Sequence, residues 1–424
     1  MEKSRYYSVT VRKFAVLTRH MDWMESTQKL YNEILRYYYN LCLDYFQEPR
    51  KENSAQTKPS DHFQGALPGS METMRILEKL TVPGRDKKTV PYPLPWKKVP
   101  LYFRRAAING AISAARSYIS RTQRQKERTK TFAEAVTFYK GMYKDFQETE
   151  ISLKLWTGSG WKWTRCKLRG NTVPLNGQMM SPALVLNKNH AELHIPWKTP
   201  VCDGRSVRER TKAENKICAV VFTNKNACIV CCIVNSLGEM ENCLFIKGGD
   251  EYSHYCRKVT DKLEKSQKSC GGVGNPRADA KYWEKLKNLN DHYAHRFSRQ
   301  VIDYCEKYGA KILVLPEFED NHRKQIMLKA GNFSPIHLST SVRKKLKYKA
   351  WQSGIVVLEI QQHKISSVCS VCGGLITRKG SEFFCENGHQ GSRYLNSARN
   401  LGKKFWEMSK REDKKIKSFI LDKL

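Results

Sequence analysis

Four potential metal ligands near the C-terminus limit most strongly what this chain can fold into. Cys369 and Cys372 are separated by two residues, Cys385 follows after twelve more, and His389 comes shortly after it. Zn²⁺ accepts thiolate and imidazole ligands in a tetrahedron, which two close pairs joined by a short polar loop can supply. The spacing therefore predicts a structural zinc ribbon. The alternative is four unligated residues in a cysteine-rich chain.

The charge balance indicates the class of partner. The chain has 424 residues, with 75 Lys and Arg against 41 Asp and Glu, and a net charge of +34. Such an excess spread along a chain that is long enough for two to four domains points first to nucleic acid. The fourteen cysteines form no secretory framework, so we expect a reducing cytoplasm. The longest apolar run, residues 227–234, has the length of a strand, so no membrane partner is expected.

The N-terminal half predicts a β-barrel module that is interrupted by helices. Residues 6–17 indicate a strand, and apolar residues recur at helical spacing from Trp23 to near Pro49 and again over 101–121. Two hairpins are expected between 151 and 197. Their tryptophans could stack on bases or pack a barrel core. The second helix has four arginines, which lie on a solvated face or contact phosphate: Arg104, Arg105, Arg116 and Arg121.

The C-terminal half predicts an RNase H-like domain. Three short strands are expected over 217–222, 227–234 and 242–246, followed by a long helical stretch to residue 308. A strand at 311–315, a basic helix over 341–352 and a strand at 355–360 complete the order that is typical of this fold. The basic helix has three further candidates for backbone contact: Arg343, Lys344 and Lys347.

Nucleases of this fold hold two divalent metals with acidic side chains on the first strand, the fourth strand and the last helix. Glu317 stands at the end of the fourth strand. The first strand, however, has Val221 and Phe222 where an acid is expected, and the last helix has Tyr394. Valine offers no ligand, and a tyrosine at neutral pH is a protonated phenol.

The chain resembles the transposon-encoded TnpB proteins and the compact type V CRISPR effectors. The resemblance is carried by LVLPEF around Glu317, by IQQHKISSVCSVCGG, by CENGH, and by LNSARNL at 395–401, where the family typically has Asp-x-Asn-Ala-Ala-Arg-Asn. It implies a multidomain α+β fold with a split, wedge-like β-barrel, a helical insertion, and a RuvC-like domain that contains the zinc ribbon. The expected ranges are 1–20 and 147–205 for the wedge, 21–146 for the insertion, 206–365 for the RuvC-like domain, 366–391 for the ribbon and 392–424 for the last helix and tail.

The resemblance implies an RNA-guided DNA endonuclease whose Asp, Glu and Asp correspond here to Val221, Glu317 and Tyr394. On that basis we expect an RNA-guided DNA-binding protein that has lost nuclease activity and that represses transcription or recruits a protein effector. We expect no Mg²⁺ at the degenerate site. An active nuclease with relocated acids is one alternative, although Asp203, Asp250 and Glu319 lie on neither the predicted first strand nor the final helix. A zinc-ribbon protein that needs no guide is the other. The implied partners are guide RNA and double-stranded DNA, in a monomer or homodimer associated with a prokaryotic nucleoid.

Overall fold

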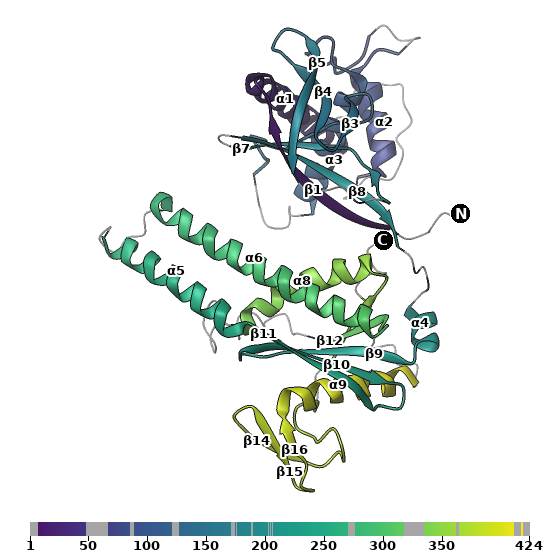
Figure 1. Ribbon diagram of the computed structural model, residues 1–424. Coiled ribbons are helices and arrows are strands. Elements are labelled where there is room, and N and C mark those ends of the chain that lie inside the picture. The colour runs from purple at the N-terminus through teal and green to yellow at the C-terminus, as the bar shows by residue number, and fades with distance from the viewer. Residues whose placement is uncertain are drawn as a thin grey trace. The chain divides into compact units, whose positions relative to one another are not determined.

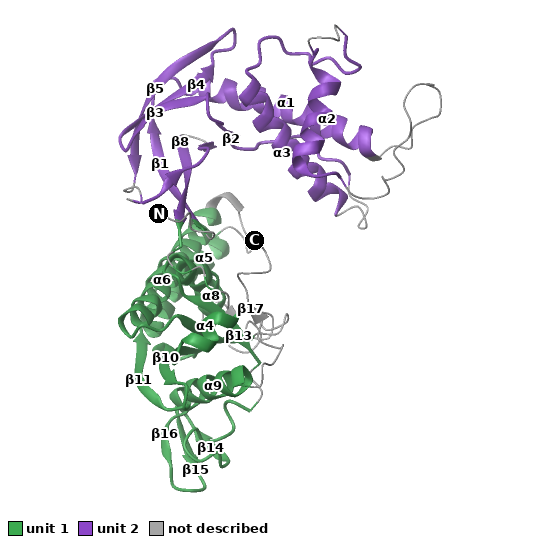
Figure 2. Cartoon of the chain, turned by 90° about the vertical axis from the view of Figure 1, so that its right-hand side faces the viewer, with its two compact units in different colours: residues 1–8, 200–424 green, residues 9–199 purple. Residues whose placement is uncertain are grey.

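The computed structural model describes two compact units, one of residues 9–199 and one of residues 1–8 together with 200–424 (Figure 2). We call them unit 2 and unit 1, as in the figure. The residues described are 7–47, 67–84, 89–120, 127–170, 174, 176–187, 190–201, 203, 205, 207–269, 276–317, 335–361, 364–410 and 417–418.

The described residues of unit 2 form three helices and eight strands. The helices are α1 (Met21–Gln47), α2 (Ser70–Thr81) and α3 (Leu101–Ile119). The strands are β1 (Tyr7–Leu17), whose first two residues belong to unit 1, β2 (Val136–Thr137), β3 (Tyr143–Gln147), β4 (Glu150–Trp156), β5 (Trp161–Gly170), β6 (Gln178–Met179), β7 (Ala183–Asn187) and β8 (His190–Pro200).

The helices of unit 2 form where apolar residues recur every three or four positions. In α1 the side chains of Leu30, Ile34 and Tyr38 are buried, as are Ile108 and Ile112 in α3. These residues join the inner side chains of the sheet in one hydrophobic cluster. The expected helices near 23–49 and 101–121 are confirmed, whereas α2 follows a polar segment and was not expected.

The sheet of unit 2 is open, which corrects the expectation of a β-barrel. Its strand order is β2-β7-β8-β1-β5-β4-β3, with β6 beside β8, and no pairing among the described residues joins the two ends. One end strand, β2, has two residues, and the other, β3, pairs irregularly with β4. Alternating hydrophobicity predicts which face of a strand is buried, but it does not determine whether the first and last strands meet.

Unit 1 is built on a central sheet with the order β11-β10-β9-β12-β13-β17. Its strands are β9 (Lys216–Phe222), β10 (Ala227–Asn235), β11 (Met240–Lys247), β12 (Ile312–Pro316), β13 (Val356–Ile360) and β17 (Lys417–Ser418). The strands β9 to β11 form an antiparallel meander, and β12 lies parallel to both β9 and β13. The expected order of strands is therefore confirmed.

Helices cover both faces of this sheet (Figure 1). The helices α5 (Gly249–Ser269), α6 (Pro276–Lys307) and α8 (Pro335–Gln352) pack on one face, and α9 (Arg393–Lys410) packs on the other. Strands buried on both faces are continuously apolar, as ICAVVF and ACIVCCIV are. The short helix α4 (Val207–Ala213) lies in a stretch that was expected to be a polar connection.

A small sheet precedes α9, and the cysteine and histidine cluster lies in and beside it. Its strands are β14 (Ile376–Lys379), β15 (Glu382–Cys385) and β16 (Gln390–Ser392). We call residues 364–392 the Cys/His segment. Among the helices that the structure describes, none has the length and apolar character needed to cross a membrane.

Candidate metal centre and nucleic-acid interface

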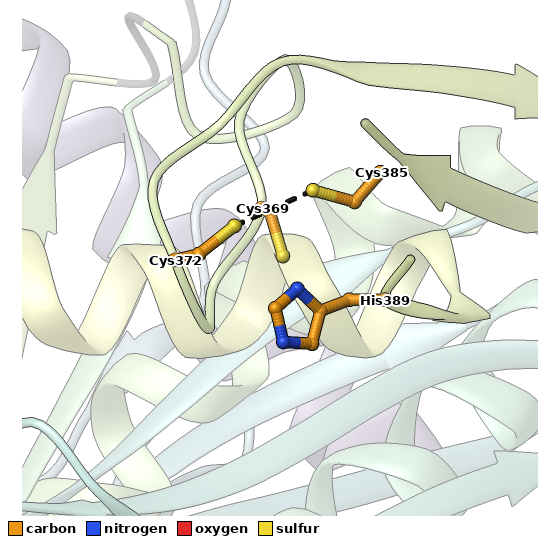
Figure 3. Close-up of side chains that lie close together, drawn as sticks. All are labelled: Cys369, Cys372, Cys385 and His389. Carbon is orange, nitrogen blue, oxygen red and sulfur yellow. Dashed lines mark hydrogen bonds between the residues drawn. The ribbon is translucent and has the colours of Figure 1, made fainter. Parts of the chain in front are cut away.

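The four predicted metal ligands converge in the Cys/His segment. The ligand atoms of Cys369, Cys372, Cys385 and His389 all lie within 4.8 Å of one another, and the Cys372 and Cys385 sulfurs are 3.4 Å apart (Figure 3). Two tight turns produce this arrangement, because Gly373 N–H donates to the Cys369 carbonyl and Gly388 N–H donates to that of Cys385. Two close pairs from separate turns therefore face a common point.

The immediate surroundings of these residues fit a bound cation. The Val371 N–H donates to the Cys369 sulfur and the Asn387 N–H to the Cys385 sulfur, each at 3.4 Å. The Asn387 side-chain amide also donates to Cys372 at 3.3 Å, and this bond, with a backbone N–H, lowers the pKa of the Cys372 thiol to about 6. Donors directed at sulfur stabilise thiolates, the form that binds metal.

The histidine of the cluster, His389, gives independent support for a bound metal ion. Its Nδ1 atom is buried and has no hydrogen-bond partner. A buried polar atom without a partner is costly, and a metal ion at the centre of the cluster would satisfy it. Three thiols and one imidazole suit Zn²⁺. Among the described residues, this is the one group of three or more Cys, His or acidic side chains with such spacing.

Two asparagines of α9 attach the Cys/His segment to the central domain. Asn396 accepts a hydrogen bond from the Ser370 N–H at 2.7 Å and donates to the Val368 carbonyl at 2.8 Å. Asn400, one turn further, donates to the carbonyls of Val368 and Ile365. Both belong to the LNSARNL run, so the asparagines of this motif bind backbone of the metal-binding turn.

The structure brings two of the three expected acid positions to one cavity of about 290 Å³ in unit 1, and the third lies directly beside it. Val221 at the end of β9 and Tyr394 at the start of α9 line it. Pro316, the residue before Glu317, lines it from β12. The N–H of Glu317 donates to the Ile360 carbonyl at 2.7 Å, which fixes the backbone at this strand end.

The basic residues predicted on α3 are engaged within unit 2. Arg105 makes a bidentate pair with Glu78 of α2, with both contacts at 3.0 Å, and Arg104 approaches the same carboxylate at 3.5 Å. Arg116 donates to the Ser70 hydroxyl and to the Pro68 carbonyl. Arg121 lies outside the described residues. Phosphate contact by this group stays a prediction.

The basic residues of α8 divide into buried and exposed ones. Arg343 pairs with the buried carboxylate of Glu359 and donates to the Pro316 carbonyl at 3.0 Å. Lys347 lies 3.3 Å from the same carboxylate. Lys344 is exposed and is the member of this group best placed to reach a partner.

An exposed basic surface on β5 was not identified from the sequence. Trp163 is 43% exposed, with the ammonium groups of Lys144 and Lys154 at 5.0 and 5.9 Å from its ring centre. The alternating residues Arg165, Lys167 and Arg169 continue along β5 and are exposed, while the residues between them are buried. The alternation of charged and buried residues in WKWTRCKLRG could have predicted this surface. Trp156 and Trp161, in contrast, pack against the core.

Parts of the chain are similar to known families and to a curated protein, and its fold is similar to that of a solved structure. Residues 340–401 match the model of the Cas12f1-like TNB domain, and residues 8–157 match the Aq_aa04 family. The CRISPR-associated endodeoxyribonuclease Cas12f1 of Sulfoacidibacillus thermotolerans is 28% identical over 122 residues, which make up 28% of each chain. A solved structure of a Cas12f1–sgRNA–target DNA complex aligns with 93% of this chain and 82% of that one, at a TM-score of 0.54 and 12% identity.

These matches confirm the resemblance to the TnpB-like, compact type V effector family. The matched segment of 340–401 contains the whole metal cluster and the start of α9. The structural match shows a similar mixed α+β fold.

The expectation that this protein is not an enzyme is overturned by the same comparison. The curated relative is named an endodeoxyribonuclease, so the comparison gives no support to a loss of nuclease activity. The prediction compared three side chains at fixed positions, and such a comparison does not detect carboxylates that reach a site from other segments. Of the other acids considered, Asp203 pairs with Arg205 at 2.7 Å, and Glu319 lies outside the described residues.

Proposed function

We propose that the protein binds a guide RNA and, through it, a matched DNA duplex. The match of residues 340–401 to the Cas12f1-like TNB domain carries this proposal, because that segment holds the metal cluster. The similar solved structure, by its title, is a complex with sgRNA and target DNA. In systems of this kind base pairing reads the sequence, while the protein holds the heteroduplex by its backbone.

The charge distribution supports a nucleic-acid partner. A net charge of +34 favours binding to phosphate, and the β5 surface combines cations with an exposed indole. A nucleic-acid base can stack on such an aromatic ring, and the neighbouring lysines can then contact the phosphates of the backbone. The predicted domain ranges, and a monomer or homodimer as the assembly, remain part of the proposal.

We propose DNA cleavage as a second activity, with unit 1 as a RuvC-like domain. The name of the curated relative favours it, as does the position of Glu317 directly beside the cavity at the ends of β9 and β12. Glu317 could serve as one hard oxygen ligand for a divalent cation. The further ligands of a two-metal site would come from segments other than positions 221 and 394.

The guide can be tested by purifying the protein from cells and sequencing the RNA that accompanies it. A discrete small RNA is the expected result. A featureless mixture of RNA would contradict guidance and would favour the alternative of a zinc-ribbon protein that binds nucleic acid without a guide.

Cleavage can be tested with the purified ribonucleoprotein, Mg²⁺ and a DNA duplex that matches the guide. Specific products are expected, and Glu317→Gln should remove them while DNA binding persists. Glu386→Gln, a change at an exposed acid of the Cys/His segment, is the control. Products that persist unchanged in Glu317→Gln would exclude a catalytic role for this residue.

We propose that the Cys/His cluster holds one structural Zn²⁺. Metal binding contributes folding free energy, so Cys369→Ser should release about one equivalent of zinc and lower the melting temperature. Cys243→Ser makes the same chemical change outside the cluster and should leave the zinc content unchanged. Equal zinc in both variants, measured by atomic emission, would refute the assignment.

A further inference from the structure

One cysteine of the metal cluster lies at the protein surface. Cys372 is exposed, whereas the side chains of Cys369 and Cys385 are buried, at 2% and 8% exposure. The neighbouring Val371 is 52% exposed, so this part of the turn faces the solvent. Oxidation of a cysteine requires that the oxidant reach its sulfur. Cys372 is therefore the cysteine of the cluster that a small oxidant reaches most easily.

The sulfur of a second cysteine lies beside this exposed one. The sulfurs of Cys372 and Cys385 are 3.4 Å apart (Figure 3). The sulfurs of a disulfide are about 2.05 Å apart, so these two atoms need to approach each other by only about 1.4 Å. Asn387 contacts both of them, because its side-chain amide donates to the Cys372 sulfur and its backbone N–H donates to the Cys385 sulfur. The protein therefore holds the two sulfurs next to each other.

Metal binding keeps these cysteines in their reactive form. A thiol that coordinates a cation is deprotonated, and the thiolate is the form that attacks an oxidant. Zn²⁺ has no redox chemistry of its own, so the electrons for an oxidation at this site come from the sulfurs.

We propose that Cys372 is a site of oxidation by hydrogen peroxide and that the product is a reversible disulfide between Cys372 and Cys385. The inference rests on the proposed zinc centre and deepens it by adding redox regulation of the same site.

The reaction has two steps. In the first, the Cys372 thiolate attacks one peroxide oxygen, so that an S–O bond forms, the O–O bond breaks and hydroxide leaves. The sulfur is thereby oxidised by two electrons to a sulfenic acid, and the peroxide is reduced. In the second, the Cys385 thiolate attacks the Cys372 sulfur, an S–S bond forms and the S–O bond breaks with loss of a second hydroxide. Two thiolates, one peroxide and two protons from the solvent thus give one disulfide and two water molecules.

The disulfide removes half of the metal ligands. Cys369 and His389 remain, and two ligands are too few to hold Zn²⁺ in its usual tetrahedron, so the site releases the metal. The Cys369 turn also contains Ser370, whose N–H donates to Asn396 of α9 at 2.7 Å. We therefore expect oxidation to loosen the Cys/His segment where it is attached to α9. Reduction of the disulfide restores the thiols and the metal site.

The test uses the full-length protein in its zinc-loaded form, treated with stoichiometric hydrogen peroxide. A chromophoric chelator records the released zinc, dimedone traps the sulfenic acid, and mass spectrometry of an unreduced digest locates the disulfide. About one equivalent of zinc should be released as the peptide linked through Cys372 and Cys385 appears, and dimedone should label Cys372. The melting temperature should fall, and dithiothreitol with added Zn²⁺ should restore it.

Two variants separate the exposed thiol from the other cysteines. Cys372→His keeps a side chain that Zn²⁺ accepts but removes the exposed thiol, so peroxide should release its zinc about tenfold more slowly than that of the wild type. Cys243→Ser removes a thiol outside the cluster and should release zinc at the wild-type rate.

Zinc that stays bound through the peroxide treatment would overturn the inference while leaving the metal centre intact. A disulfide that includes Cys369, or dimedone on Cys369 or Cys385 in place of Cys372, would overturn it as well. If Cys372→His binds no zinc, the digest of the wild-type protein decides. If the purified wild-type protein holds no zinc, the proposed metal centre fails, and the digest then shows whether the two thiols are oxidised as a pair.

Discussion

The Glu359 carboxylate is buried in β13 and is neutralised by two cations of α8. Arg343 and Lys347 both reach it, and Arg343 is itself only 8% exposed. A buried charge without a partner is strongly destabilising, so Arg343 has a structural role whatever else it contacts. The sequence indicated a basic helix, but charge patterning alone does not reveal which cations face a buried acid.

Replacing Arg343 with methionine should lower the free energy of unfolding by about 3–5 kcal/mol, because Glu359 would then be insufficiently compensated. Urea denaturation measures the change. Lys344→Met, a neighbouring substitution at an exposed position, should alter stability by less than about 0.5 kcal/mol. If Arg343→Met were as stable as the wild type but bound RNA weakly, Arg343 would be a nucleic-acid contact.

Lys349 introduces a pH dependence of stability. Burial, with the nearby charges of Arg299 and Lys345, lowers its pKa from the ordinary 10.5 to about 8, and the ammonium donates to the His295 carbonyl and the Ser298 hydroxyl. Between about pH 8 and 10.5 the unfolded chain therefore binds more protons than the folded protein. Stability contributed by this group consequently rises with pH across that interval.

The Lys349→Met variant should lose this contribution, so its stability should rise less, or fall more steeply, with pH than that of a control variant. Urea midpoints measured at several values between pH 8 and 10.5 provide the test, with Lys344→Met as the control at an exposed lysine of the same helix. The same change of midpoint with pH in Lys349→Met and in the control would show that Lys349 makes no such contribution.

At the scale of secondary-structure elements, the position of α9 depends on a glycine. A Cβ atom at Gly402 would come within 2.6 Å of a methyl carbon of Val234 in β10. The absence of a side chain therefore allows the helix to approach the sheet closely. Gly402→Ala should destabilise unit 1 by about 1–3 kcal/mol despite the better helix propensity of alanine, because α9 must move away from β10.

Thermal unfolding measures this effect, and Ser409→Ala, near the C-terminal end of α9, is the control for helix propensity. A melting temperature of Gly402→Ala at or above that of the control would show that α9 shifts at no cost.

The attachment of the Cys/His segment to α9 can be tested separately. Asn396→Ala removes one acceptor and one donor for buried backbone groups at Ser370 and Val368, which should cost about 1–3 kcal/mol. The expected readouts are a lower melting temperature and faster transfer of zinc to a chelator. Glu407→Ala, an exposed change on the same helix, should leave the transfer rate unchanged. A normal rate in Asn396→Ala would mean that the turn keeps its structure without α9.

Elements were predictable from sequence where the signal was local. Helical spacing identified α1 and α3, and the apolar runs identified β9, β10 and β12. The metal cluster was equally local, since its ligand spacing lies within one short segment. Closure of the unit 2 sheet depends on contacts between distant strands, and the expected barrel was wrong for that reason.

At the scale of the whole molecule, the site residues come from distant parts of the sequence. Val221, Pro316 and Tyr394 meet at one cavity because β9 and β12 are parallel neighbours and α9 packs across them. The order of elements predicted that these positions converge. The contribution of Arg378 to this cavity was not predictable from the sequence. Arg378 lies in the Cys/His segment, which the ligand spacing identified only as a metal site.

The packing of α9 also has a consequence for biosynthesis. The strand β9 pairs with β10, which follows it directly, and with β12, where Cys218 lies opposite Leu313. A chain emerging from the ribosome can form the β9–β11 meander early, but pairing between sequence-distant strands is slow. Until α9 has been synthesised, the face of the sheet that includes Val221 and Val234 lacks the described helix that packs on it. We therefore expect the nascent chain to need chaperone protection until synthesis has passed α9.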